Sequence, residues 1–136
     1  PVDGSMMDPS LYLKKNADGQ IVVETVDLLY AAAEEGMRAD FENKSVEVKG
    51  QFLSARIGNP GGNRFQLMRL FVMCCAADAR PVAITVQAKP GTQFPEMTWV
   101  KVIGTATFPV EGGRHLTLIE ADSVSETEPP DESFTY

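Results

Sequence analysis

Val46-Glu47-Val48-Lys49-Gly50 and Val100-Lys101-Val102-Ile103-Gly104 share the pattern Val-x-Val-x-Gly, and these two stretches decide the predicted fold. The alternation of apolar side chains is typical of a strand that buries one face. A glycine inside a strand marks a sharp bend or a bulge. Small closed β-barrels need such bends, so the repeated pattern predicts a barrel rather than a flat sheet.

Three further segments with strand patterns bring the predicted number of strands to five. The strands are expected at about 45–54, 65–75, 81–88, 98–108 and 114–122. The connection between the third and fourth strands contains Pro90, Gly91 and Pro95, which excludes a helix there. We therefore predict a mainly β domain over residues 11–124. Its fold is a five-stranded, antiparallel Greek-key barrel of the oligonucleotide/oligosaccharide-binding (OB) type.

One amphipathic helix is predicted before the barrel, over residues 25–38. Thr25 suits the N-cap position, and apolar residues recur at helical spacing at Val26, Leu29, Tyr30, Ala33 and Met37. We expect this helix to pack against the barrel and cap it. Residues 20–23 are expected to add an edge strand.

Both ends of the chain differ from this domain in composition. We set residues 1–10 aside as disordered or as a cloning remnant, because Gly4-Ser5-Met6 is typical of one. Residues 125–136 are acidic and rich in proline, which predicts an extended, solvated tail. The alternative is that Phe134 and Tyr136 anchor the tail on this domain or on a partner.

Charge and hydropathy limit the classes of function. The 136 residues include 12 Lys and Arg against 19 Asp and Glu, which gives a net charge of −7. This sign disfavours binding to nucleic acid and to anionic lipid, because both need a basic surface. The sequence contains no apolar run of about eighteen residues, so it predicts no direct membrane insertion.

The two cysteines, Cys74 and Cys75, are adjacent at the end of the second predicted strand. Neighbouring Cα atoms lie about 3.8 Å apart, below the roughly 4.4 Å minimum usual for a disulfide, so a bridge between them would be strained. Strand alternation sends the two sulfurs to opposite faces. A tetrahedral zinc site would have to recruit Asp78 and the only histidine, His115. We expect reduced packing cysteines and no metal or cofactor, with redox or metal chemistry as the alternative.

The candidate residues for binding a ligand or partner cluster around these cysteines and at one aromatic residue. They are Arg69, Cys74, Cys75, Asp78 and Trp99. His115 is expected to be a satisfied edge residue, although a pairing with a cysteine stays open. Trp99 could stack on bases, but the acidic balance favours a packing role.

These residues also resemble a known family. The motif Arg69-x-Phe71-x-x-Cys74-Cys75-x-Ala77-Asp78-Ala79, followed by Trp99-Val100-x-Val102-x-Gly104, is similar to the C-terminal soluble domain of bacterial two-component permease-complex subunits, a domain of unknown function. The similarity covers roughly residues 20–136. It implies association with a polytopic, permease-like membrane protein, and it implies no substrate or reaction.

Three hypotheses follow. The first is a noncatalytic accessory domain of a bacterial membrane permease system that acts by protein–protein or small-ligand binding. The second is a thiol-dependent metal-binding or redox domain centred on Cys74 and Cys75, and the third is an OB-fold nucleic-acid binder. Under the first hypothesis the domain is membrane-associated through its partner or through an upstream segment. The side of the membrane and homo-oligomerisation stay open.

Overall fold

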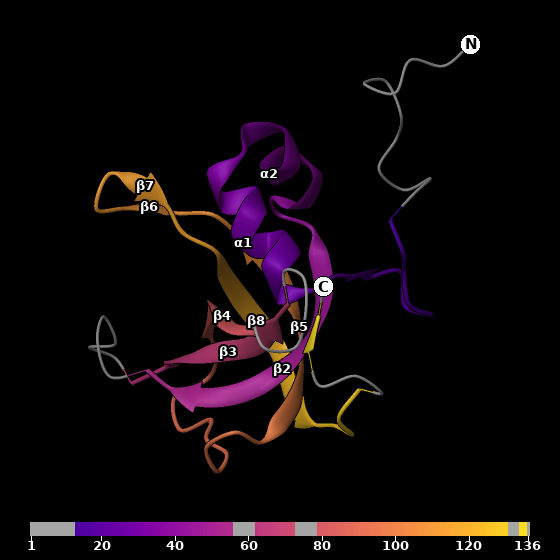
Figure 1. Cartoon of the computed structure of the whole chain (residues 1–136), viewed down its shortest axis with the longest axis vertical. Coiled ribbons are helices and arrows are strands. Elements are labelled where there is room, and N and C mark those ends of the chain that lie inside the picture. The colour runs from indigo at the N-terminus through magenta and orange to yellow at the C-terminus, as the bar shows by residue number, and fades with distance from the viewer. Residues whose placement is uncertain (1–12, 56–61, 73–78, 131–133, 136) are drawn as a thin grey trace.

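The structure is a computed structural model that describes residues 13–55, 62–72 and 79–130, together with the backbone of residues 134–135. Its elements in chain order are β1 (Ile21–Val22), α1 (Thr25–Ala33), α2 (Glu35–Phe41), β2 (Ser45–Ser54), β3 (Arg64–Phe71), β4 (Arg80–Gln87), β5 (Trp99–Thr107), β6 (Val110–Glu111), β7 (Arg114–His115), β8 (Leu118–Glu126) and β9 (Phe134–Thr135). Figure 1 shows α1 and α2 together at one end of the barrel, and the connection between β4 and β5 at the other.

Five strands close into a ring. The sheet runs β2-β5-β8-β4-β3, and β3 pairs back onto β2, which leaves no open edge between them. Four of the five pairings are antiparallel and the β4–β8 pairing is parallel. The structure confirms the predicted mainly β, five-stranded OB-type barrel, with the difference that one of its pairings is not antiparallel.

The two Val-x-Val-x-Gly stretches are direct neighbours in this barrel. In the antiparallel register of β2 and β5, Val46 lies opposite Gly104 and Gly50 lies opposite Val100. The valines of both stretches are fully buried. Each glycine therefore sits opposite a bulky residue of the other strand, on the face that forms the core.

Both glycines allow a third strand to approach closely. A Cβ on Gly50 would lie 2.8 Å from Cγ of Leu67 on β3, and a Cβ on Gly104 would lie 2.3 Å from the backbone oxygen of Glu120 on β8. The β5–β8 register also shifts between Ile103 and Gly104, as expected for a bulge. Glycine is needed at both positions because any side chain would push the neighbouring strand outward.

The helical segment is divided into two helices rather than one. Glu34 is extended (φ −127°, ψ 118°) between α1 and α2. Its carboxylate accepts hydrogen bonds from the backbone N–H groups of Gly36 (3.0 Å) and Met37 (2.8 Å), so it caps α2. These two bonds hold the pKa of Glu34 below its usual value of 4.5. Thr25, the expected N-cap, is buried, and Glu24 occupies the N-cap position of α1 instead.

The helices cap the barrel through the buried face of α1. Leu28 and Ala31 are fully buried in the same core cluster as the barrel valines. The hydroxyl of Thr117, just before β8, donates a 2.6 Å hydrogen bond to the backbone oxygen of Leu28. This bond is buried and fixes α1 to the chain that enters the last barrel strand.

The last part of the chain differs from the predicted 114–122 strand. β7 pairs with β6 in a separate two-stranded hairpin, because Gly112 and Gly113 turn the chain with positive φ values of 63° and 81°. The barrel strand β8 starts only at Leu118 and runs on to Glu126, so the first residues of the expected acidic tail belong to the barrel. The backbone of β9 then pairs in parallel with β3 at Leu70 and Phe71.

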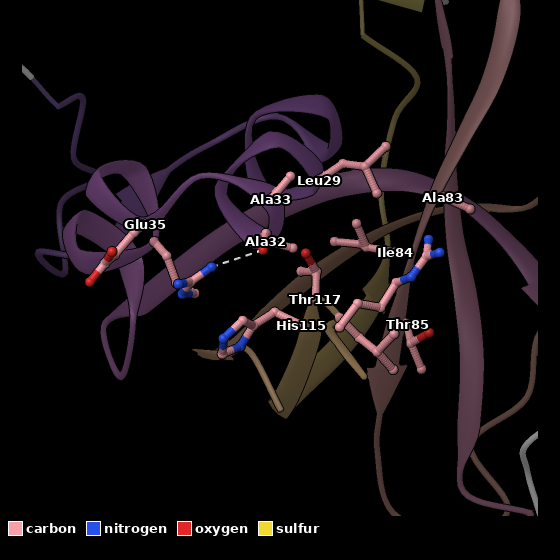
Figure 2. A pocket seen from close by; sticks show the side chains of 12 residues that line it. Leu29, Ala32, Ala33, Glu35, Ala83, Ile84, Thr85, His115 and Thr117 are labelled. Carbon is pink, nitrogen blue, oxygen red and sulfur yellow. Dashed lines mark hydrogen bonds between the residues drawn. The ribbon is translucent and has the colours of Figure 1, made fainter. Parts of the chain in front are cut away.

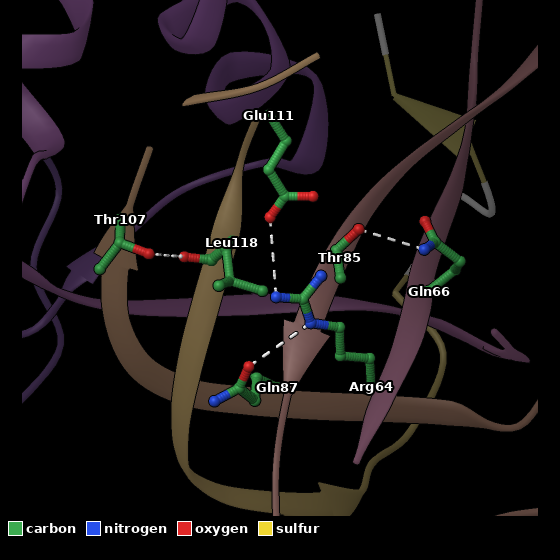
Figure 3. Close-up of polar contacts among 7 residues, drawn as sticks. All are labelled: Arg64, Gln66, Thr85, Gln87, Thr107, Glu111 and Leu118. Atoms are coloured by element: carbon green, nitrogen blue, oxygen red, sulfur yellow. Dashed lines mark hydrogen bonds and ion pairs between the residues drawn. The ribbon is translucent and has the colours of Figure 1, made fainter. Parts of the chain in front are cut away.

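Polar contacts on the outer face of the barrel join these elements (Figure 3). The guanidinium of Arg64 on β3 lies 3.7 Å from the carboxylate of Glu111 on β6 and donates to Gln87 on β4 at 3.4 Å. The hydroxyl of Thr107 on β5 donates to the backbone oxygen of Leu118 on β8 at 2.7 Å. The ion pair between Arg64 and Glu111 thus connects the β6–β7 hairpin to the barrel.

β1 adds the expected edge strand, parallel to the start of β2.

Within the described ranges, neither helix combines the length and the apolar character that crossing a bilayer requires.

Candidate functional site

The cysteine part of the predicted site lies outside the described residues. Cys74, Cys75 and Asp78 all fall in the 73–78 gap. Among the residues that the structure describes, no three His, Cys, Asp or Glu side chains form a group that could hold a metal ion. Three of the four proposed metal ligands lie in this undescribed segment. The metal-binding and redox hypotheses therefore stay predictions.

The structure brings Arg69 and Trp99 together. Arg69, on β3, is 4% exposed, and its guanidinium carbon lies 5.4 Å from the centre of the Trp99 ring at the start of β5. The same guanidinium donates to the carboxylate of Glu24 at 3.0 Å. A cation over an aromatic face and a partly buried ion pair are both attractive. The contacts join β3, β5 and the start of α1, which indicates that Arg69 holds the cap on the barrel.

The predicted metal candidate His115 lies elsewhere, in a groove between the helices and the barrel (Figure 2). The groove has a volume of about 800 Å³. It is bounded by α1 and α2 on one side and by β4 and the chain from β7 to β8 on the other. The lining residues are Leu29, Ala32, Ala33, Glu35, Arg38, Ala83, Ile84, Thr85, Arg114, His115, Leu116 and Thr117.

The groove follows from how α1 is packed. Because Leu28 and Ala31 point into the core, the adjacent faces of the helix turn Leu29 and Ala33 toward solvent and toward the groove. Leu29 remains 39% exposed. The burial of Leu28 and Ala31 therefore determines which apolar side chains of α1 face the groove.

The break between the helices positions the first basic group of the groove. Arg38 on α2 donates from its guanidinium to the backbone oxygen of Ala32 at 2.9 Å, near the end of α1 (Figure 2). This bond satisfies one of the carbonyls left free at a helix C-terminus. Arg38 also lines the groove.

The ring of His115 is oriented by the chain before it. Its Nδ1 lies 2.7 Å from the backbone oxygen of Phe108. Because a carbonyl oxygen can only accept, the hydrogen in this bond belongs to Nδ1. Nε2 is then the ring atom that can interact with a ligand, as an acceptor in the neutral ring or as a donor in the protonated one.

Sequence reasoning missed Arg38 and Arg114 as site residues. One lies near the end of a helical pattern and the other beside a glycine turn, where a solvated arginine is the ordinary expectation. No motif links them, because they approach the same groove only after the β6–β7 hairpin folds toward the helices. Arg114 is adjacent in sequence to His115, and that was the one signal that could have drawn attention to it.

The closed barrel, its helical cap and the lateral groove define the chain as a small OB-type domain. The model of the DUF1980 C-terminal domain family matches residues 10–136, so the chain belongs to that family, a domain of unknown function.

Comparison with solved structures gives remote similarities. The chain is similar to the Stn1–Ten1 complex of S. pombe, with 8% identity, coverage of 87% of this chain and 86% of that chain, and a TM-score of 0.48. It is also similar to an aspartyl-tRNA synthetase from Entamoeba histolytica, with 16% identity and a TM-score of 0.42, where it covers 96% of this chain and 25% of that one. Similarities at this level carry no conclusion about function. A search of curated proteins gives no significant match.

Proposed function

We propose that this chain is a noncatalytic accessory domain of a bacterial membrane permease system and that it acts by binding at the groove between α1, α2, β4 and the β7–β8 connection. The groove is the observation that carries the binding role. The permease context rests on the resemblance of the double-cysteine and Trp99 motifs, and the partner is a polytopic, permease-like membrane protein.

The exposed apolar residues of α1 support a protein contact beside the groove. Tyr30 is 51% exposed and Leu29 is 39% exposed, on adjacent positions of the helix. Tyrosine is among the residues that most often dominate the binding energy of an interface. Tyr30 does not line the groove, so it can contact a partner while the groove itself holds a ligand.

Affinity capture tests this proposal. The whole chain, tagged at its N-terminus, is incubated with detergent-solubilised membranes of the bacterium that encodes it, and the retained proteins are identified by mass spectrometry. We expect a polytopic membrane protein, and we expect Tyr30→Ser to reduce its recovery at least about fivefold, since a central tyrosine contributes at least about 1 kcal/mol.

The matched control is Met97→Gln, which also removes an exposed apolar side chain but at the opposite end of the barrel. It should leave recovery unchanged. The proposal fails if no polytopic membrane protein is retained, or if Tyr30→Ser and Met97→Gln behave alike.

A further inference from the structure

The groove concentrates positive charge in an acidic protein. The whole chain carries −7 with its histidine counted as neutral, yet two arginines, Arg38 and Arg114, line this groove beside only one carboxylate, that of Glu35. Within the part of the chain that the structure describes, neither Arg38 nor Arg114 lies within ion-pair distance of a carboxylate, since the ion pairs found there involve Arg64 and Arg69. Neither arginine is thus engaged in an ion pair among the described residues, although the carboxylate of Glu34 interacts electrostatically with Arg38.

The donors of these groups suit a planar anion. A guanidinium presents five N–H donors in a rigid fork that matches a carboxylate, and among the described residues the guanidinium of Arg38 makes one hydrogen bond, to Ala32. The hydroxyl of Thr85 also lines the groove, although the amide of Gln66 already donates to it at 3.1 Å.

Most of the remaining lining is apolar, which favours an organic anion over a small hydrated one. Leu29, Ile84 and Leu116 are the largest apolar residues of this lining, and Figure 2 shows Leu29 and Ile84 close together beside Thr117. A volume of about 800 Å³ lies within the range of about 300–1,000 Å³ that is usual for small-molecule sites. An apolar body of this scale gains free energy from burial, which a simple inorganic anion cannot.

We propose that the groove binds an organic carboxylate with an apolar body, of the chemical class of a medium-chain fatty acid. Its carboxylate is held by Arg114, and its chain lies on Leu29 and Ile84. The role of this ligand as the cargo or signal of a permease system rests on the proposed function, whereas its binding to the isolated chain does not.

Calorimetric titration of the whole chain with decanoate tests the inference, with decyltrimethylammonium and acetate as matched probes. Decanoate should bind saturably, and the cation with the same chain should bind at least about tenfold more weakly. Acetate, which has the charge without the chain, should show no saturable binding. Arg114→Gln should weaken decanoate binding roughly tenfold, because it removes a charge-assisted hydrogen bond to the carboxylate.

Lys49→Gln is the control, because it removes one exposed positive charge from β2, which does not line the groove. It should leave the affinity for decanoate unchanged. Equal binding of decanoate and decyltrimethylammonium would overturn the inference, as would the absence of saturable decanoate binding or equal effects of Arg114→Gln and Lys49→Gln.

The two proposals fail separately. Loss of membrane-protein capture with intact decanoate binding contradicts the permease role alone. Intact capture that depends on Tyr30, without decanoate binding, contradicts the ligand alone.

Discussion

Replacement of Gly104 by alanine should unfold or strongly destabilise the barrel. The new Cβ would lie 2.3 Å from the backbone oxygen of Glu120 and 2.7 Å from Cα of Ala121, whereas ordinary contacts begin near 3.4 Å. Both obstacles are backbone atoms of β8, so no side-chain rotation relieves the overlap. The strand would have to move by about 1 Å next to the bulge, where it pairs with β5.

The expected cost combines overpacking with weakened ladder hydrogen bonds. Overpacking of a core costs about 1–3 kcal/mol, and about two backbone hydrogen bonds of about 1 kcal/mol each would be strained. The loss of glycine's freedom in the unfolded chain returns about 0.4–1 kcal/mol. We therefore expect Gly104→Ala to lower the free energy of unfolding by about 2–4.5 kcal/mol.

Urea denaturation, followed by circular dichroism and by the fluorescence of the only tryptophan, Trp99, measures this change. Gly50→Ala should be milder, because its closest obstacle is the side chain of Leu67 at 2.8 Å, although the oxygen of Met68 follows at 2.9 Å. Thr105→Ala, on the outward face of β5, should cost less than about 1 kcal/mol. A loss below about 0.5 kcal/mol for Gly104→Ala, or a larger loss for Gly50→Ala, would refute the argument from close approach.

Three further outcomes are expected. Glu34→Ala should lower the thermal midpoint at pH 7, because it removes the cap of α2. Since the pKa of Glu34 is lowered in the folded state, the stabilisation is present above the ordinary value of 4.5 and is lost as the pH falls through the folded value. The midpoints of wild type and variant should therefore converge in acid, and a constant difference would contradict the cap. Thr117→Val should cost about 1 kcal/mol in urea denaturation, because it removes the buried hydrogen bond to Leu28, and an unchanged midpoint would show that this bond contributes nothing net. A labelled single-stranded oligonucleotide should show no change of fluorescence anisotropy with the chain at near-physiological salt, because a protein at −7 offers few phosphate contacts; micromolar binding that weakens with added salt would reverse this prediction.

The barrel could be predicted from the sequence because its determinants are local. Alternation with period two and a glycine within a strand act on neighbouring residues, so Val46–Gly50 and Val100–Gly104 identified two bent strands without any knowledge of their partners. The first barrel strand was predicted at 45–54, the bounds that the structure gives it. The presence of a capping helical segment was likewise visible from its apolar spacing.

The helix caps could not be predicted in the same way, because more than one residue is able to cap each helix. Thr25 and Glu34 could each end or begin a helix, and the outcome depended on burial. Burial against the barrel took Thr25 out of the N-cap position, and an extended Glu34 could cap α2 with its carboxylate. The sequence shows which residues are able to cap, but not which of them the packing leaves free to do so.

The groove and its charge were decided by the tertiary structure alone. Arg38 on α2, Arg114 on the β6–β7 hairpin and Ile84 on β4 are far apart in the chain, and nothing in their spacing relates them. They meet because the parallel pairing of β4 with β8 places the chain that leads into β8, with the β6–β7 hairpin before it, beside the helices. The sequence by itself therefore determined the strands, their bends and the net charge, since these depend on neighbouring residues and on composition. The site needed the closed ring, because only long-range strand pairing places two arginines and a histidine around one apolar groove.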